Sequence, residues 1–457
     1  MQRDRLLITA DAVVTMDSQR RLHTPGYLRI SDQHITEVGG GAPQQLPGEV
    51  YQHLDGGLVL PGLVNAHHHL ASTLLQGVQP DSTIDLTNDH QDVRQRLGMA
   101  TDRAACRAGA LLGYLQLVTA GVTATADSQA PYRDLAKLDG SLEAAHEAGL
   151  RVRFTTAFTD RTELVPSAQQ LSIDEALAEL ERVRGIYEYG RVTVDPEALS
   201  LPRASDGLIR ALHRERGRLM AMHLTYSRRF DAWAREELGT STVAHLDRLG
   251  VLDGLLAAHP IHLDDDEVER LGSNGVTAAY CPVSNAHLGL AVADVPRLAR
   301  AGVVVGLGLD HPNGSHDAFQ NTKAGLLAQR ARAESPDAWR PDDALAAATI
   351  DAAHALGWGD QIGSLEAGKL ADLVVLDGRR AELQPPGGLI EPVVTGATAA
   401  SVRHVMIGGH WEVVDGRPQR LDRQAIVDEA ATAQRRVLVQ AGLDPTPRQA
   451  QRQLDDG

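Results

Sequence analysis

Cysteine is scarce in this chain, and long apolar runs are absent. The two cysteines, Cys106 and Cys281, are too few for a disulfide framework, and neither belongs to the Cys-x-x-Cys pair of a thiolate zinc site. No run reaches the ~18 apolar residues of a membrane span, and the first residues lack the apolar stretch and cleavage site of a secretory signal. We therefore expect a cytoplasmic protein that does not enter a membrane.

Positive charge is also in short supply. Lysine and arginine total 44 against 60 aspartates and glutamates, which gives a formal net charge of −16. This balance argues against a nucleic-acid partner, because a protein that neutralises phosphates presents a basic surface. The chain has 457 residues, of which 43% are hydrophobic, so it contains enough apolar material for a large buried core.

The middle of the chain has a regular pattern. Residues 61–360 repeat a strand, a loop and a helix, which predicts a parallel sheet. Eight short buried runs fit the strands of that sheet: GLVNAH, GVTATAD, LRVRFTTAF, RVTVDPE, RLMAMH, LLAAHP, VTAAYCP and VVVGLGLD. Eight such units predict a closed (β/α)8 TIM barrel, which places its chemistry at the carboxyl ends of the strands.

The two ends of the chain have a different pattern. Short alternating segments occur in residues 1–60 and return in residues 361–420, so we expect both ends to build one composite β-sandwich. Residues 421–457 form a polar tail with a helical pattern. The predicted organisation is therefore a barrel flanked by a composite sandwich and followed by a helical tail.

Three consecutive histidines follow the first barrel strand. Side chains alternate along a strand, so His67 and His69 should point to one face and His68 to the other. Two imidazoles on one face at the mouth of a barrel can share a metal ion. A histidine-rich tract alone is also compatible with a polar loop, so the interpretation depends on the other strands.

Other strands end in residues of the same chemical kind. His223 ends RLMAM, His259 ends LLAA and Asp310 ends VVVGLGL, and each is the first strongly polar residue after a buried run. A single such histidine is more often a hydrogen-bonded core residue. Several at one barrel face are hard to explain by packing, and nitrogen and carboxylate ligands that leave room for water describe a hydrolytic metal site.

Several motifs resemble the amidohydrolase superfamily, in its branch of aminohydrolases and triazine hydrolases that includes guanine, 8-oxoguanine and S-adenosylhomocysteine deaminases. The resemblance covers nearly the whole chain. It is carried by PGLVNAHHHL (61–70), AHPIHLDDDEVERL (258–271), CPVSNAHLG (281–289), GLGLD (306–310) and IGSLEAGKLADLVVLD (362–377). These motifs together are far more specific than the paired histidines alone.

The resemblance implies a role for each polar strand end. It makes four residues the ligands of one divalent metal ion, most simply Zn²⁺ with Fe²⁺ or Mn²⁺ as alternatives: His67, His69, His223 and Asp310. His259 would contact the attacking hydroxide or the substrate and move protons, and Asp310 would accept the proton of the attacking water. Binuclear relatives bridge two metals with a modified lysine, but no lysine occurs between Lys137 and Lys323. The resemblance also implies a homodimer.

One position departs from the family pattern. Deaminases of this branch carry His-x-x-Glu after the fifth strand, whereas this chain reads His223-Leu224-Thr225-Tyr226. A tyrosine, with an ordinary pKa of about 10, is a much weaker acid than a carboxylic acid. Tyr226 is therefore a catalytic hydrogen-bond donor, a wall for an altered substrate, or a filler in an inactive barrel, and a glutamate from another loop could replace the missing acid.

Three further residues are candidates for the substrate pocket. Gln76 follows the histidine pair, and His311 and His316 lie in the loop after Asp310. Residues 81–89 also lie where relatives recognise their substrates. For the two loop histidines, exposure to solvent is the simpler interpretation.

The leading functional hypothesis is the hydrolytic removal of an amino group, chloride or alkylamine from a small nitrogen-containing ring. An alternative is the ring-opening hydrolysis of a cyclic amide or imide, in which Tyr226 would stabilise an oxyanion. A second alternative is a metal-stabilised binding protein without activity. The two reactions share all four metal ligands, so their products distinguish them, and full metal occupancy without turnover would favour the binding protein.

Overall fold

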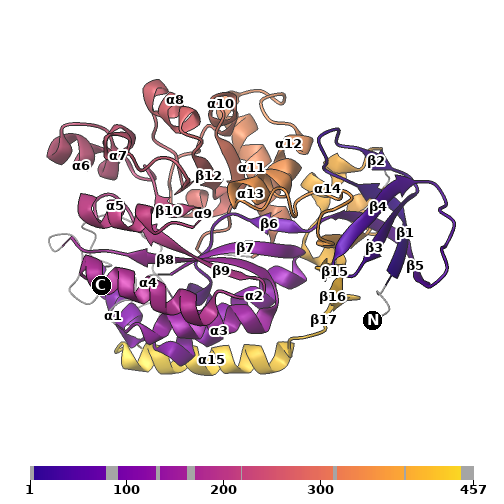
Figure 1. The fold of residues 1–457 in the computed structure, drawn as a ribbon, viewed down its shortest axis with the longest axis horizontal. Coiled ribbons are helices and arrows are strands. Elements are labelled where there is room, and N and C mark those ends of the chain that lie inside the picture. The colour runs from indigo at the N-terminus through magenta and orange to yellow at the C-terminus, as the bar shows by residue number, and fades with distance from the viewer. Residues whose placement is uncertain are drawn as a thin grey trace.

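The computed structural model describes residues 5–78, 91–129, 134–161, 170–217, 219–311, 316–384 and 387–443. Figure 1 shows a barrel surrounded by helices and, at one side of it, a smaller sheet in which the first and last strands of the chain lie together. No helix in these ranges is long and apolar enough to cross a membrane.

The barrel consists of eight parallel strands in sequence order. They are β6 (Leu63–Asn65), β7 (Val122–Gln129), β8 (Arg151–Phe158), β9 (Val192–Ala198), β10 (Met220–His223), β11 (Leu255–Ala258), β12 (Thr277–Tyr280) and β13 (Val304–Leu307). The last strand closes on the first, because the Ala66 amide donates to the Leu307 carbonyl at 2.8 Å and the Leu309 amide to the His67 carbonyl at 3.1 Å. The predicted (β/α)8 barrel is confirmed, and each of the eight predicted runs overlaps one of its strands.

Helices follow the strands and cover the barrel. They are η1 (Leu70–Leu75), α1 (Gln91–Ala100), α2 (Arg103–Thr119), α3 (Ala136–Ala148), α4 (Ile173–Tyr187), α5 (Asp206–Arg214), α6 (Arg228–Leu238), α7 (Thr242–Leu249), α8 (Asp265–Ser273), α9 (Pro282–His287), α10 (Val295–Arg300), α11 (Ala318–Ala333), α12 (Pro341–Ala347) and α13 (Ile350–Ala355). Many begin at a side chain that satisfies the free amides of the first turn. Ser172 forms a capping box with Glu175, and Asp264 forms one with Glu267.

The second sheet has nine strands from both ends of the chain, in the order β17-β16-β15-β14-β5-β1-β3-β4 with β2 on β1. The strands are β1 (Arg5–Val14), β2 (Leu22–His23), β3 (Gly26–Ser31), β4 (His34–Gly40), β5 (Glu49–Pro61), β14 (Leu373–Asp377), β15 (Val402–Ile407), β16 (His410–Val414) and β17 (Arg417–Pro418). β5 pairs in parallel with β1 and antiparallel with β14, so it joins the two chain ends. The predicted composite β-structure built from both chain ends is confirmed, and its strands form one mixed sheet.

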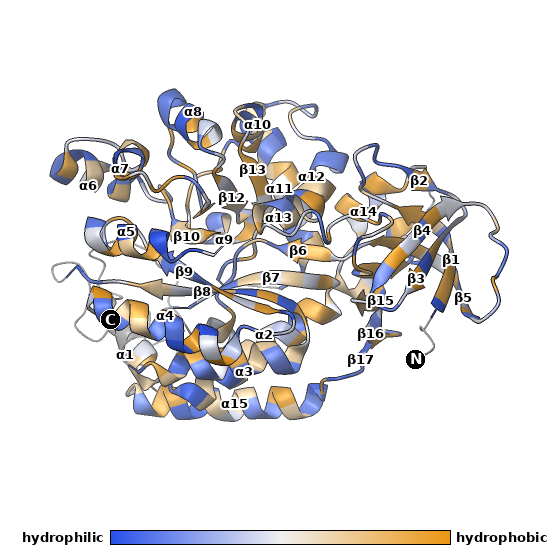
Figure 2. Ribbon diagram, in the orientation of Figure 1, coloured by the Kyte–Doolittle hydropathy of each residue, from blue (hydrophilic) through white to orange (hydrophobic). Residues whose placement is uncertain are grey.

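The C-terminal part is helical where the structure describes it. After η3 (Ala381–Leu383), α14 (Ile390–Gly396) and η4 (Ala399–Ser401), the chain ends in α15 (Arg423–Gln440). Figure 2 shows apolar residues concentrated on the strands, whereas α15 has both hydrophilic and hydrophobic residues along its length. Its buried side chains Ala430, Ala433 and Val437 are three or four residues apart and belong to an apolar cluster with residues of η1 and α2. The domain boundaries expected from the sequence stay predictions.

Candidate active site

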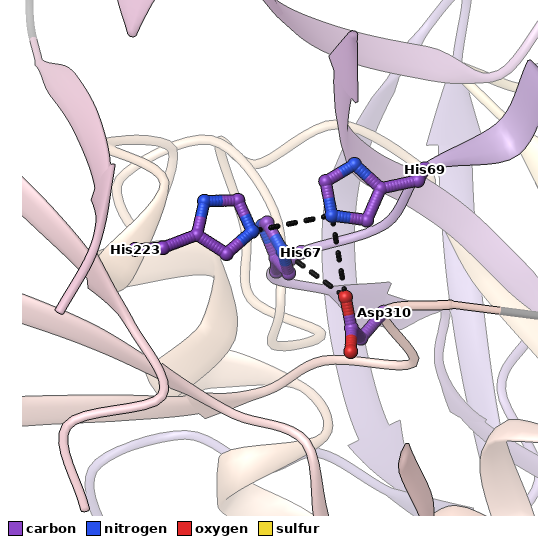
Figure 3. Close-up of side chains that lie close together, drawn as sticks. All are labelled: His67, His69, His223 and Asp310. Carbon is purple, nitrogen blue, oxygen red and sulfur yellow. Dashed lines mark hydrogen bonds and ion pairs between the residues drawn. The ribbon is translucent and has the colours of Figure 1, made fainter. Parts of the chain in front are cut away.

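Four side chains meet at the carboxyl ends of three barrel strands. His67, His69, His223 and Asp310 each offer one ligand atom, and these atoms lie within 4.8 Å of one another. The Nε2 atoms of His69 and His223 are 3.2 Å apart, and Asp310 Oδ1 lies 3.4 Å from His67 Nε2 and 3.3 Å from His69 Nε2 (Figure 3). The structure therefore brings together the four residues that the sequence predicts as ligands.

The backbone around this cluster is unusual. Asp310 has a φ of +58° and His259 a φ of +56°, both in the left-handed region that residues other than glycine rarely adopt. Thr225, which is β-branched and lies between His223 and Tyr226, has a φ of +42°. Such conformations cost of order 1–3 kcal/mol each and collect at functional sites, where the surrounding structure holds them.

The imidazole nitrogens and the carboxylate oxygen that the four side chains turn toward one another fit a divalent metal ion. His69 Nδ1 donates to the Ser128 carbonyl at 2.9 Å, and His223 Nδ1 lies 3.2 Å from the Leu199 carbonyl, so both rings present the Nε2 lone pair to the cluster. His67 Nε2 is buried and makes no hydrogen bond. Three imidazole nitrogens and one carboxylate are a donor set that zinc and related ions take in hydrolytic sites.

The protonation states also suit a metal. Burial lowers the pKa of His67 to about 3, so the ring is neutral at physiological pH. Burial alone would raise the pKa of Asp310, but His259, His67 and His69 outweigh it and hold that pKa well below its ordinary value. Neutral imidazole and ionised carboxylate are the forms that bind a metal ion.

His259 lies against the second oxygen of Asp310. Its Nε2 is 3.6 Å from Asp310 Oδ2, and its Nδ1 donates to Asn285 Oδ1 at 2.9 Å. Asn285, in α9, thus orients the His259 ring. Ser284 also donates a hydrogen bond to Asp310 Oδ2. The two oxygens of Asp310 therefore have different surroundings, one facing His67 and His69 and the other His259.

The Tyr226 side chain is buried beside these histidines. Its ring centroid lies 6.3 Å from that of His223, 6.2 Å from that of His259 and 4.6 Å from that of Phe230. Only 4% of Tyr226 is exposed. The residue that departs from the family pattern is thus next to the candidate chemistry, and its role stays a prediction.

Comparison with known proteins gives the family. Residues 58–411 match the amidohydrolase family. The chain belongs to the amidohydrolase family. This confirms the predicted hydrolase class, whose members act on carbon–nitrogen bonds.

Three individual proteins are similar to this amidohydrolase over almost its whole length. A 5-methylthioadenosine/S-adenosylhomocysteine deaminase of Pelotomaculum thermopropionicum is 31% identical over 93% of this chain and 97% of its own. An adenosine deaminase of Xanthomonas campestris with bound zinc has a TM-score of 0.85 and 25% identity, covering 95% of this chain and 98% of its own. An atrazine chlorohydrolase of Arthrobacter aurescens complexed with zinc has a TM-score of 0.86 and 19% identity, covering 94% and 100%, and shows the shared fold.

The three predicted pocket residues of the amidohydrolase lie in different places. The His311 ring is 5.4 Å from that of His69, beside the cluster. Gln76 is exposed at the end of η1, and its carbonyl accepts from Gln434 of α15 at 3.5 Å. His316 is buried against His68, with ring centroids 4.8 Å apart. Residues 81–89 lie outside the described residues, and the substrate contacts of these positions stay predictions.

One buried carboxylate of the amidohydrolase site was not predicted from the sequence. Glu197 on β9 is 0% exposed, and its Oε1 lies 3.1 Å from His223 Nδ1. Burial alone would raise the pKa of Glu197, but the contact with His223 outweighs it and lowers the pKa to about 2. A signal was present, because Glu197 ends the predicted strand RVTVDPE just as His223 ends RLMAMH.

Proposed function

We propose that this amidohydrolase removes an amino group from a small nitrogen heterocycle by metal-dependent hydrolysis, with an adenosine derivative as the first substrate to test. The observation that carries the proposal is the convergence of His67, His69, His223 and Asp310 at the mouth of the barrel, with His259 beside Asp310. The similarity to deaminases of adenosine and its derivatives supports the substrate class.

In the proposed chemistry, the metal ion and the protein side chains have separate roles. One divalent ion held by the four ligands, zinc in our proposal with iron or manganese as alternatives, would supply a Lewis acid that brings the pKa of a water molecule to ~7. Asp310 Oδ1 faces the other ligands, whereas Oδ2 faces His259 and is available to accept the proton of the attacking water. His259, oriented by Asn285, presents Nε2 to the same proton.

A second reaction is favoured by Tyr226. Where relatives carry a glutamate, this buried phenol cannot protonate a ring nitrogen well but can donate a hydrogen bond to an oxyanion. Ring-opening hydrolysis of a cyclic amide or imide would use it in that way. Release of ammonia with an intact ring supports deamination, and a ring-opened acid supports the alternative.

The proposal is tested by metal analysis and product detection together. We expect about one equivalent of zinc per chain, as in other open hydrolytic sites, and its loss in the His67→Ala, His69→Ala double variant. Adenosine, S-adenosylhomocysteine and 5-methylthioadenosine are then incubated with the zinc-loaded protein while ammonia is measured. Metal retention in the double variant would refute the site, and full zinc occupancy without turnover of any nitrogen heterocycle would favour a binding protein.

Two broader expectations belong to the same proposal. We propose a homodimer in the cytoplasm, since relatives commonly form dimers and two cysteines are too few for a disulfide framework. Light scattering of the purified protein measures its mass directly. A monomer at micromolar concentration would contradict the dimer.

A further inference from the structure

Glu197 is a buried carboxylate beneath the candidate metal site. It lies on β9, with its Oε1 3.1 Å from His223 Nδ1, and its Oε2 accepts a hydrogen bond from Thr155 on β8 at 2.6 Å. Both Glu197 and Thr155 are almost completely buried. His223 Nε2, at the opposite end of the ring, faces His69 at 3.2 Å. Glu197 thus touches His223 on the side away from the cluster.

The charge of Glu197 lacks a cationic partner. On the same strand, the buried Asp195 forms an ion pair with Arg153 on β8. No lysine or arginine in the described parts of the chain forms an ion pair with Glu197, which contacts a neutral hydroxyl and the His223 ring. A buried carboxylate is costly unless an opposite charge compensates it. The arrangement therefore leaves one negative charge for a cation to balance.

We propose that Glu197 is a positioning residue that holds His223 as a metal ligand and balances half of the charge of a divalent ion. The inference rests on the proposed metal site. The Leu199 carbonyl accepts from Nδ1–H and so fixes the tautomer in which Nε2 carries the lone pair, and the Glu197 charge 3.1 Å from Nδ1 makes Nε2 a stronger donor. Three neutral histidines, Asp310 and Glu197 then neutralise a +2 ion.

The Leu199 carbonyl limits the loss of metal affinity that we expect when the Glu197 charge is removed. It accepts from His223 Nδ1 at 3.2 Å, so the same tautomer stays in place when the Glu197 charge is removed. Glu197→Gln should therefore weaken metal binding and leave the ligand set intact. Loss of a carboxylate behind a ligating histidine typically lowers metal affinity about 10- to 100-fold.

The experiment measures zinc affinity by competition with a chromogenic chelator, independently of turnover. We expect Glu197→Gln to raise the Kd for zinc about 10- to 100-fold, with the circular dichroism spectrum of the metal-free protein unchanged. The matched control is Glu179→Gln on α4, a buried carboxylate that pairs with Arg182 at 2.7 Å and should leave zinc affinity unchanged. Saturating zinc should restore most of the kcat of Glu197→Gln, because a positioning residue does not touch the substrate.

Three outcomes distinguish a failure of the role proposed for Glu197 from a failure of the proposed metal site. Zinc affinity of Glu197→Gln within about twofold of wild type would overturn the role of Glu197, since the expected loss is at least tenfold. Zinc retention by the His67→Ala, His69→Ala variant would instead refute the metal site itself. If Glu197→Gln does not fold, Thr155→Val removes only the hydroxyl that holds Glu197, and unchanged zinc affinity in that variant would count against the proposal.

Discussion

At the scale of single residues, His259 is arranged for proton transfer. Asn285 fixes its Nδ1, and its Nε2 faces Asp310 Oδ2 at 3.6 Å. Groups that transfer protons in the transition state are typically worth ~10² to 10⁴ in rate, so His259→Asn should lower kcat by at least 10² with the zinc content unchanged. His245→Asn is the control, because His245 pairs with Asp206 on α5. A His259→Asn variant with more than about a third of wild-type kcat would show that the histidine is structural.

Tyr226 decides which reaction the pocket supports. If its hydroxyl donates to charge that appears only in the transition state, Tyr226→Phe should lower kcat about 10² to 10³ with little change in KM. Steady-state kinetics on the true substrate measure this, with the exposed Tyr51→Phe as the control. Tyr226→Glu restores the family pattern and should create weak activity on aminated heteroaromatics. An unchanged kcat for the Phe variant would remove Tyr226 from the mechanism.

The residues that sequence could predict share one property. His223, His259 and Asp310 are the first strongly polar residues after apolar runs, and a barrel gathers such positions at one face. The supporting contacts could not be predicted, because they depend on side-chain packing between separate loops. Asn285 reaches His259 from 26 residues away in sequence. His316, expected in the pocket loop, packs against His68 instead of joining the four clustered residues.

At the scale of elements, local chemistry sets where helices begin. α5 begins at Asp206, because Ser205 accepts the Leu208 amide and caps the helix. α4 begins at Ile173, and the capping box of Ser172 and Glu175 explains its start. The four-residue strands β10 to β13 end where pairing with their neighbours ends, so their lengths depend on tertiary contacts.

The cap of α8 gives an element-scale prediction. Asp264 accepts the Glu267 amide at 2.9 Å at the start of the helix. Asp264→Ala should lower the free energy of unfolding by about 1 kcal/mol, because it removes this cap. The urea midpoint measures the change, and kcat should stay the same. Asp265→Ala is the control, since Asp265 is an exposed partner of Arg297 and should cost less than about 0.5 kcal/mol. Equal midpoints for the two variants would contradict the capping role.

At the scale of the whole molecule, buried histidines should make the fold sensitive to acid. Burial lowers the pKa of His316 to about 4, whereas an unfolded histidine titrates at about 6.5. Between these values the unfolded state binds more protons, so stability is full above about pH 6.5 and falls as pH drops toward 4. The difference between the folded and unfolded pKa values of His316 corresponds to a loss of roughly 3 kcal/mol in the free energy of unfolding.

The metal-free protein allows a direct test of this acid sensitivity. The free energy of unfolding is measured at pH 7 and pH 4.5 for wild type and His316→Gln. The variant should lose less stability on acidification, because glutamine does not titrate. An identical loss in both proteins would mean that other groups determine the acid response.

The mixed sheet also determines when this protein can finish folding. β5 pairs on one edge with β1 and on the other with β14, which lies far along the chain and is synthesised much later. Until β14 leaves the ribosome, β5 keeps an unpaired edge of the kind that promotes association with other chains. β5 continues directly into β6, the strand that leads to His67 and His69. A chain truncated before β14 should therefore lose the support of its metal ligands and aggregate, although all four ligands would be present.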